Sequence, residues 1–175
     1  MSRPRPRIFR LCPAILRPGR ACLRPARPGD GPAAWAVLRR AVHEGAAGAY
    51  GPAALSVWAP PDPPAGWEGG LLAARTVIGA RRGRMRGFMT LGGDGHLDYV
   101  YVLPEEMGGD LAPRLLAAIE AAARARALPV LTTEASHLAR RFLEKHGWRM
   151  LSRQDVIRAG VAVTNFRMER SLGPE

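Results

Sequence analysis

The residues from Asp98 to Leu116 combine an apolar run, a glycine turn and the start of a helix. The apolar run is expected to form a strand, and the turn at Gly108 and Gly109 opens directly into a helix with an apolar stripe. A helix that begins at such a turn presents unpaired amide hydrogens and a positive dipole end. The turn is therefore a candidate site for a phosphate-bearing ligand.

Asp110 places a negative charge where the phosphates of such a ligand would lie. Two unit charges about 4 Å apart cost about 1–4 kcal/mol, depending on whether the dielectric is bulk or surface-like. Two interpretations stay open. Asp110 either perturbs a ligand site, or it is an N-cap of the helix that follows, ahead of Pro113.

His96 and Asp98 are candidates for accepting a proton. Period-two alternation places them on one face of the strand, unless a bulge intervenes. Each has a structural alternative: His96 as a turn residue after Gly95, and Asp98 as a buried group that needs a hydrogen-bonding partner.

Length and composition predict one domain with a hydrophobic core, residues 21–175 of the 175. The net charge of +11 is concentrated at the start, where eight arginines precede the first acid, Asp30, and the remaining residues carry 18 basic and 15 acidic groups. Nucleic acid is therefore not expected as a partner of the domain. Residues 1–20 are interpreted as a disordered Arg/Pro-rich arm or an over-extended start, with a transit peptide or a nucleic-acid-binding arm left open.

The apolar pattern excludes a membrane span, because no run of about 18 apolar residues occurs. Cys12 and Cys22 match neither a disulfide framework nor a metal site, so no metal is expected and a cytoplasmic location is predicted.

Turn and periodicity signals predict an α/β (α+β) fold with a mixed, mostly antiparallel central sheet flanked by helices. The expected elements, in order, are an edge strand at 22–26, helices after Asp30 and after Pro52, strands at 71–80, 85–91 and 96–103, a helix at 111–127, a strand at 130–135, a helix at 137–146 capped by Ser136, and two strands between 148 and 172. The strand at 96–103 is apolar on both faces and is expected to be central. The arginines around the first hairpin, at positions 75, 81, 82, 84 and 86, are interpreted as a solvated face, with a patch for an anionic partner as the alternative.

This order, together with the junction Val102-Leu-Pro-Glu-Glu-Met-Gly-Gly-Asp-Leu-Ala112, resembles the GNAT superfamily of acetyl-CoA-dependent N-acetyltransferases. The resemblance covers about residues 22–172. Other stretches that carry it are Leu23 to Asp30, Tyr50 to Pro60, Thr133 to Ser136, Ala139 to Trp148 and Val163 to Glu169. The set is similar to a bacterial subgroup of small, single-domain members.

The resemblance implies acetyl-CoA as co-substrate, with pantetheine along Val102 and Leu103 and the pyrophosphate at the turn. The implied cofactor residues are Val102, Leu103, Gly108, Gly109, Asp110, Leu111, Ala112 and Ser136. Within the superfamily signature Ala112 fits, whereas Met107 and Asp110 depart from it. The tyrosine that many members use as general acid is replaced by Leu143.

The resemblance also places Tyr50, Trp58 and Tyr99 on the acceptor side, with ordinary packing as the alternative. Tyr101 is either a core aromatic or the substitute acid. A lysine-like amine with a pKa of about 10.4 is mostly protonated at neutral pH, so a base, Asp98 or His96, matters more than the missing acid.

Three functions stay open at this stage. The leading hypothesis is an N-acetyltransferase acting on a small-molecule or peptide amine, and a homodimer is left open. The second is a GNAT-fold binding or regulatory module that does not use acetyl-CoA. The third is nucleic-acid binding through the N-terminal arm.

Overall fold

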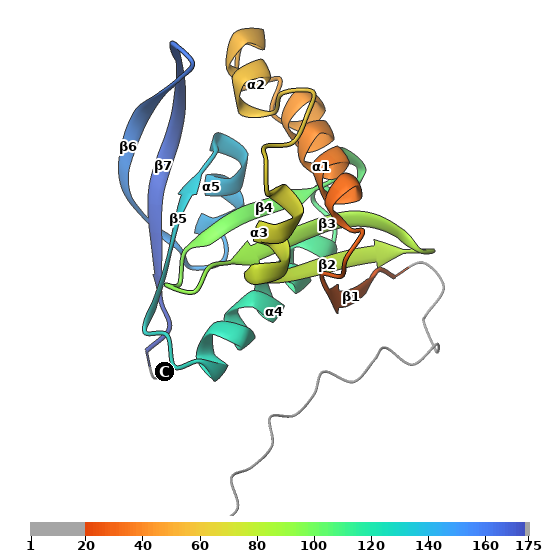
Figure 1. Ribbon diagram of the computed structural model, residues 1–175. Coiled ribbons are helices and arrows are strands. Elements are labelled where there is room, and N and C mark those ends of the chain that lie inside the picture. The colour runs from red at the N-terminus through yellow and green to blue at the C-terminus, as the bar shows by residue number, and fades with distance from the viewer. Residues whose placement is uncertain (1–19, 174–175) are drawn as a thin grey trace, which may run out of the picture.

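Two antiparallel sheets that touch at one corner form the frame of the protein (Figure 1). The structure is a computed structural model, and it describes residues 20–173. The first sheet has the order β1 (Cys22–Pro25), β2 (Arg75–Arg81), β3 (Arg84–Leu91), β4 (Leu97–Val102). The second has the order β5 (Val130–Ala135), β7 (Val161–Ser171), β6 (Arg149–Arg158).

The two sheets meet where β4 begins. A parallel bridge pairs His96 with Thr132, and the Thr133 hydroxyl donates to the carbonyl of Leu97 at 2.7 Å. Beyond this corner β4 and β5 diverge, as Figure 1 shows. The divergence leaves one edge of β4 without a neighbouring strand.

Helices cover both faces of the first sheet. One side carries α1 (Gly31–Arg40), its π-helical continuation η1 (Ala41–Gly45), α2 (Pro52–Trp58) and α3 (Trp67–Ala73). The other side carries α4 (Leu111–Ala125), and α5 (His137–Glu144) packs on the second sheet (Figure 1). A short 3-10 turn, η2 (Pro104–Glu106), links β4 to α4. The α/β class and the mostly antiparallel sheet predicted from the sequence are confirmed.

Two hydrophobic cores lie on either side of the first sheet. On β3, Met89 and Leu91 belong to the core under α4, whereas Phe88 belongs to the core under α1 and α3. All three are fully buried. This double burial explains why these strands are apolar on both faces.

Two sequence predictions about the strands are wrong. The strand expected at 71–80 begins only at Arg75, because residues 67–73 form α3 after Gly66 takes a left-handed conformation (φ 76°). The strand expected to be central, β4, lies at the edge of its sheet. Helices on both faces, and not strands on both edges, account for its apolar pattern.

The register between β3 and β4 shifts at Asp98. Thr90 pairs with Tyr99 and Leu91 pairs with Leu97, so Asp98 is the extra residue of a bulge. The predicted arm, residues 1–20, lies outside the described residues except for Arg20.

Candidate functional site

A groove and a cavity open between the diverging sheets, and they share a wall. The groove, of about 490 Å³, runs from the centre of β4 to the turn before α4 between η1 and α5. The cavity, of about 530 Å³, lies on the other side of the same wall. The residues that line both are Trp58, Val100, Tyr101, Ser136 and Ala139. Two molecules bound in these spaces would meet at that wall.

The groove leads to the amide groups at the start of α4. Gly108 and Gly109 line its end, and Gly108 needs its glycine because its φ is 76°. The first helical hydrogen bond runs from the Arg114 amide to the Asp110 carbonyl, at 3.3 Å. Within residues 20–173 the amides of Gly108 and Asp110 donate no hydrogen bond, and no side chain caps the helix. The amides therefore remain free for an anion.

Asp110 occupies the N-cap position without capping the helix. Its carboxylate lies 3.0 Å from Nε of Arg20 and 3.6 Å from an Nη of Arg114. The carboxylate is exposed and does not accept from the amides of its own helix. The N-cap interpretation thus holds for the backbone position only, and the negative charge is partly offset by two arginines.

The loop that carries the turn is held from beneath by Glu106. This carboxylate is only 6% exposed, and it accepts from Arg81 at 3.0 Å and from Arg86 at 2.9 Å. The neighbouring Glu105 is exposed and contacts Arg40 and Arg86. The hairpin arginines predicted to be a solvated face include two, Arg81 and Arg86, that fix this loop, so that prediction is wrong for them.

The open edge of β4 presents main-chain donors to the groove. The Leu103 amide donates to the Arg86 carbonyl at 2.8 Å, and this bond shows which amides of β4 point toward β3. Because the pattern alternates, the amides of Val100 and Val102 point away from β3. Both residues line the groove.

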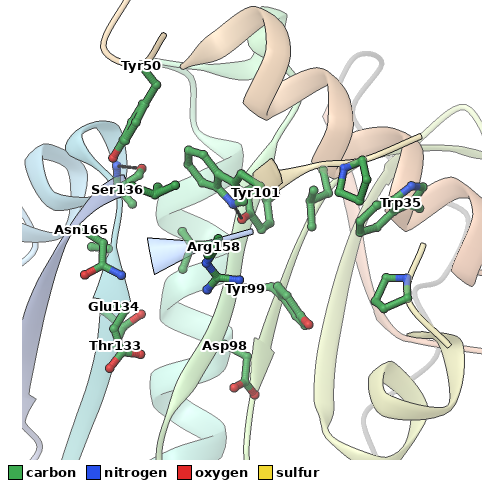
Figure 2. A pocket seen from close by; sticks show the side chains of 18 of the residues that line it. Trp35, Tyr50, Asp98, Tyr99, Tyr101, Thr133, Glu134, Ser136, Arg158 and Asn165 are labelled. Carbon is green, nitrogen blue, oxygen red and sulfur yellow. Dashed lines mark hydrogen bonds between the residues drawn. The ribbon is translucent and has the colours of Figure 1, made fainter. Parts of the chain in front are cut away.

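Aromatic side chains and acids line the cavity on the other side of the wall (Figure 2). Its residues include Trp35, Tyr50, Trp58, Trp67, Tyr99 and Tyr101, together with Asp62, His96, Asp98, Glu134 and Arg158. The cavity thus joins apolar walls to a cluster of acids.

His96 and Asp98 both face this cavity, but in different states. The two ring nitrogens of His96 are engaged, Nδ1 with the Thr132 hydroxyl at 3.0 Å and Nε2 with Glu134 at 2.9 Å. The Asp98 carboxylate makes no hydrogen bond within residues 20–173. Partial burial raises the pKa of Asp98, and the electrostatic interaction with His96 opposes that rise. Of the two predicted bases, Asp98 is therefore the one that makes no hydrogen bond and is free to take a proton.

Tyr101 stands in the shared wall. Its hydroxyl accepts from the indole N–H of Trp58 at 3.1 Å, and its own hydrogen has no acceptor within residues 20–173. Burial raises the pKa of Tyr101 to about 12. The hydroxyl therefore keeps its proton at physiological pH, and it is a neutral hydrogen-bond donor in the wall between the groove and the cavity.

Two other predicted residues tie elements together at the wall. The Tyr50 hydroxyl donates to the Thr164 carbonyl at 2.8 Å and accepts from the His137 amide at 3.1 Å. The Ser136 hydroxyl accepts from the Ala139 amide at 3.1 Å and caps α5, as the sequence indicated. Both residues therefore have structural roles beside any contact with a ligand.

The predicted cofactor residues differ in whether they line the groove. Val102, Gly108, Gly109 and Ala112 line it, whereas the side chains of Leu103 and Leu111 lie in the cores. Leu143, at the position matched to the family's tyrosine, is fully buried. The groove wall on α5 and just after it is instead formed by residues that sequence reasoning did not assign, Leu138, Arg141, Phe142, Lys145 and His146.

Two charged residues of the cavity were also missed. Glu134 is exposed between buried Thr133 and Ala135, and this alternation on β5 was a usable signal. Arg158 reaches the cavity from the end of β6, and no sequence pattern connects that strand end to β4. No group of three or more metal-ligating side chains occurs in residues 20–173, and no helix there is long and apolar enough to cross a membrane.

Comparison with known proteins gives one family. Residues 50–170 match the model of the Acetyltransferase (GNAT) domain. A GCN5-related N-acetyltransferase structure from Rhodopseudomonas palustris is 30% identical, covers 90% of this chain and 99% of its own, and has a TM-score of 0.79. No curated protein matches the chain.

More distant structures share the fold. PaiA N-acetyltransferase from Thermoplasma acidophilum, in complex with coenzyme A, is 16% identical over 86% of this chain and 98% of its own, with a TM-score of 0.67. YncA from Salmonella typhimurium, a putative acetyltransferase with acetyl-CoA, is 17% identical over 89% and 95%, with a TM-score of 0.63. The chain belongs to the GNAT acetyltransferase family, as the sequence resemblance indicated.

Proposed function

We propose that the protein is an N-acetyltransferase that moves the acetyl group of acetyl-CoA to a primary amine. The observation that carries this proposal is the shared wall. A groove that ends at free helix amides and a cavity that contains an unpaired carboxylate meet at Val100 and Tyr101. An acyl donor and an acceptor held on opposite sides would have their reacting atoms in contact there.

The groove fits the parts of acetyl-CoA in order. Its lining is mostly apolar, which suits the pantetheine arm, and the pyrophosphate would lie on the amides of residues 108–112. The thioester supplied by acetyl-CoA is the acyl donor. The outward amide of Val100 or Val102 would stabilise the negative charge that develops on the acyl oxygen.

Asp98 is proposed as the base, acting directly or through a water molecule. An ammonium group must lose a proton before its nitrogen attacks the carbonyl carbon, and Asp98 takes that proton. The C–N bond forms and the C–S bond breaks, and the departing sulfur takes a proton, for which the Tyr101 hydroxyl in the shared wall is the proposed donor. Overall an ammonium and acetyl-CoA yield an amide, free CoA and one proton released to solvent.

A thiolate leaves without much help, because a thiol has a pKa of about 8.5. The substitution of the family's tyrosine by Leu143 is therefore compatible with catalysis. Tyr101, whose hydroxyl holds its proton up to a pKa of about 12, would mainly donate a hydrogen bond to the sulfur or to the acyl oxygen.

The second candidate is a binding or regulatory module that does not use acetyl-CoA. The departures from the signature at Met107 and Asp110 favour it. Arg20 and Arg114 beside Asp110, and the free amides of the turn, weigh against it. Binding of nucleic acid by the N-terminal arm, a cytoplasmic location, a bacterial source and a homodimer remain predictions.

Isothermal titration with acetyl-CoA, followed by a thiol-release assay against a panel of amines, tests the proposal. We expect binding, and thiol release that depends on both an amine and Asp98. No binding at millimolar acetyl-CoA would favour the second candidate. Binding without release for any amine, in wild type and Asp98→Asn alike, would also contradict the catalytic proposal.

A further inference from the structure

Arg158 is the only lysine or arginine among the described residues that line the acceptor cavity. It lies at the end of β6, and Figure 2 shows its side chain among those of Tyr99, Tyr101 and Asp98. Arg158 is exposed, and within residues 20–173 its guanidinium makes no hydrogen bond or ion pair, whereas Arg81 and Arg86 of the first hairpin are both paired. An unpaired guanidinium at a cavity is available to an anionic group of a ligand.

Electrostatic effects support this position. Burial raises the pKa values of Tyr99 and Tyr101, and the positive charge of Arg158 opposes the rise at both. Arg158 therefore acts on the cavity that holds both rings. Of the three acids that line the same cavity, Asp98 and Glu134 lie around His96, and none of the three pairs with Arg158.

The cavity thus presents three kinds of surface. One part has carboxylates that attract an ammonium group, a second has a guanidinium that attracts an anion, and the walls are aromatic. Trp35 and Trp67 pack edge to face at 5.0 Å, and Trp67 packs against Tyr99 at 5.1 Å. A volume of about 530 Å³ is much larger than an amine alone requires.

We propose that the acceptor is an amino carboxylate with a large apolar or aromatic side chain. Its amine lies at Asp98, its carboxylate binds the fork of Arg158, and its side chain packs on the aromatic walls. The inference rests on the proposed acetyl transfer and names the class of acceptor. The reaction is the one already described: the nitrogen of the amino acid gains the acetyl group, the sulfur gains a proton, and a second proton leaves to solvent.

The test compares L-phenylalanine with 2-phenylethylamine, which lacks only the carboxylate, in the thiol-release assay with wild type and Arg158→Gln. We expect Arg158→Gln to lower kcat/KM for phenylalanine roughly 10- to 100-fold, as loss of a charge-assisted, bidentate contact implies. We expect kcat/KM for 2-phenylethylamine to change less than about twofold. The two amines differ in basicity, but this difference cancels because kcat/KM of the variant is compared with that of wild type for the same substrate. Arg153→Gln, on the same strand but outside the cavity lining, is the matched control and should leave both values unchanged.

A second measurement separates this inference from the proposed function. Titration of N-acetyl-L-phenylalanine into the CoA-bound protein should show binding that Arg158→Gln weakens by a similar factor. Transfer to 2-phenylethylamine with equal effects of Arg158→Gln on both substrates would overturn the inference and leave the acetyltransferase proposal intact. Arg158-dependent binding of N-acetylphenylalanine without transfer to any amine would support the inferred site and overturn the catalytic proposal. Absence of both transfer to phenylalanine and binding of its N-acetyl derivative would overturn the inference.

Discussion

The carboxylate of Asp110 lies 3.0 Å from the guanidinium of Arg20, and it leaves the amides at the start of α4 without a cap. This pair changes how the departure from the family signature is understood. A carboxylate that capped its own helix would occupy the donors that a pyrophosphate needs. Here Asp110 is turned toward arginines, so its effect on the proposed binding of acetyl-CoA would be mainly a matter of charge.

Replacing Asp110 by Asn should tighten acetyl-CoA binding. The carboxylate is exposed and flanked by Arg20 and Arg114, so the gain belongs at the low end of the Coulomb range, about 1 kcal/mol or roughly fivefold in Kd. Because exposed charges are screened by salt, the gain should shrink at high ionic strength. Isothermal titration at two salt concentrations measures it. Glu169→Gln removes a charge in the second sheet and serves as control; equal Kd values for wild type and Asp110→Asn would contradict the prediction.

Removing the hydroxyl of Tyr101 should slow acetyl transfer without weakening the binding of acetyl-CoA. Tyr101→Phe deletes the donor in the shared wall and leaves the Trp58 indole without its acceptor. We expect kcat to fall roughly 10- to 100-fold, in the range of a lost transition-state donor, with the Kd for acetyl-CoA unchanged. Since burial raises the pKa of Tyr101 to about 12, no loss of rate from its ionisation should appear below about pH 11. A kcat within twofold of wild type would remove Tyr101 from the mechanism.

Asp98 should set the acidic limit of the pH profile. Only the ionised carboxylate takes a proton, and partial burial raises its pKa, so kcat/KM for the amine should fall as pH drops through that raised pKa. Asp98→Asn should lower kcat/KM by about 10²-fold or more. Steady-state rates across pH, with His96→Gln for comparison, give the result. A larger loss in His96→Gln than in Asp98→Asn would reverse the assignment of the base.

The raised pKa of Asp98 also predicts that replacing this residue by Asn increases the stability of the fold. A carboxyl whose pKa is raised on folding binds protons more readily in the folded state, so its ionisation at neutral pH opposes folding. Asp98→Asn should therefore be slightly more stable than wild type at pH 7, by less than about 1 kcal/mol because solvent screens the group, and the difference should vanish at acidic pH. Thermal unfolding followed by circular dichroism at both pH values measures this. A less stable Asn variant at pH 7 would contradict the sign.

Glu106 and Glu105 offer a matched pair of substitutions. Glu106 is buried and accepts from Arg81 and Arg86, so Glu106→Gln should lower the free energy of unfolding by about 2–3 kcal/mol. Glu105 is exposed, and Glu105→Gln should cost less than about 1 kcal/mol. Urea unfolding measures both. Acetyl-CoA affinity should also fall in Glu106→Gln. Similar free energies of unfolding for the two variants would contradict the role of Glu106 in holding the loop before Gly108.

The elements with a strong local signal could be predicted from the sequence. The stripe on α4 is fixed by Leu111, Leu115 and Ile119, and Ser136 marks the start of α5 through its hydroxyl. The hairpin of β6 and β7 follows from its turn at Ala159 and Gly160. These features depend on periodicity and capping, which neighbouring residues determine.

The features that were not predicted depend on contacts between distant residues. Helix α3 contains two glycines and has no strong stripe, and burial of Trp67 and Leu71 against the rest of the fold decides it. The edge position of β4 follows from its divergence from β5, which its own residues do not encode. Arg158 reaches the cavity only because the β6–β7 hairpin extends over it.

The anchoring of Glu106 has a consequence for how this turn can vary. Two arginines of the hairpin beneath hold the chain before Gly108, so the shape of the turn does not depend on the residues at its outer surface. Met107 and Asp110 are both exposed there. Substitutions at these two positions alter the charge and polarity seen by a ligand while the main-chain geometry is kept. The departures from the family signature at Met107 and Asp110 are therefore compatible with an unchanged main-chain geometry of the turn at Gly108 and Gly109.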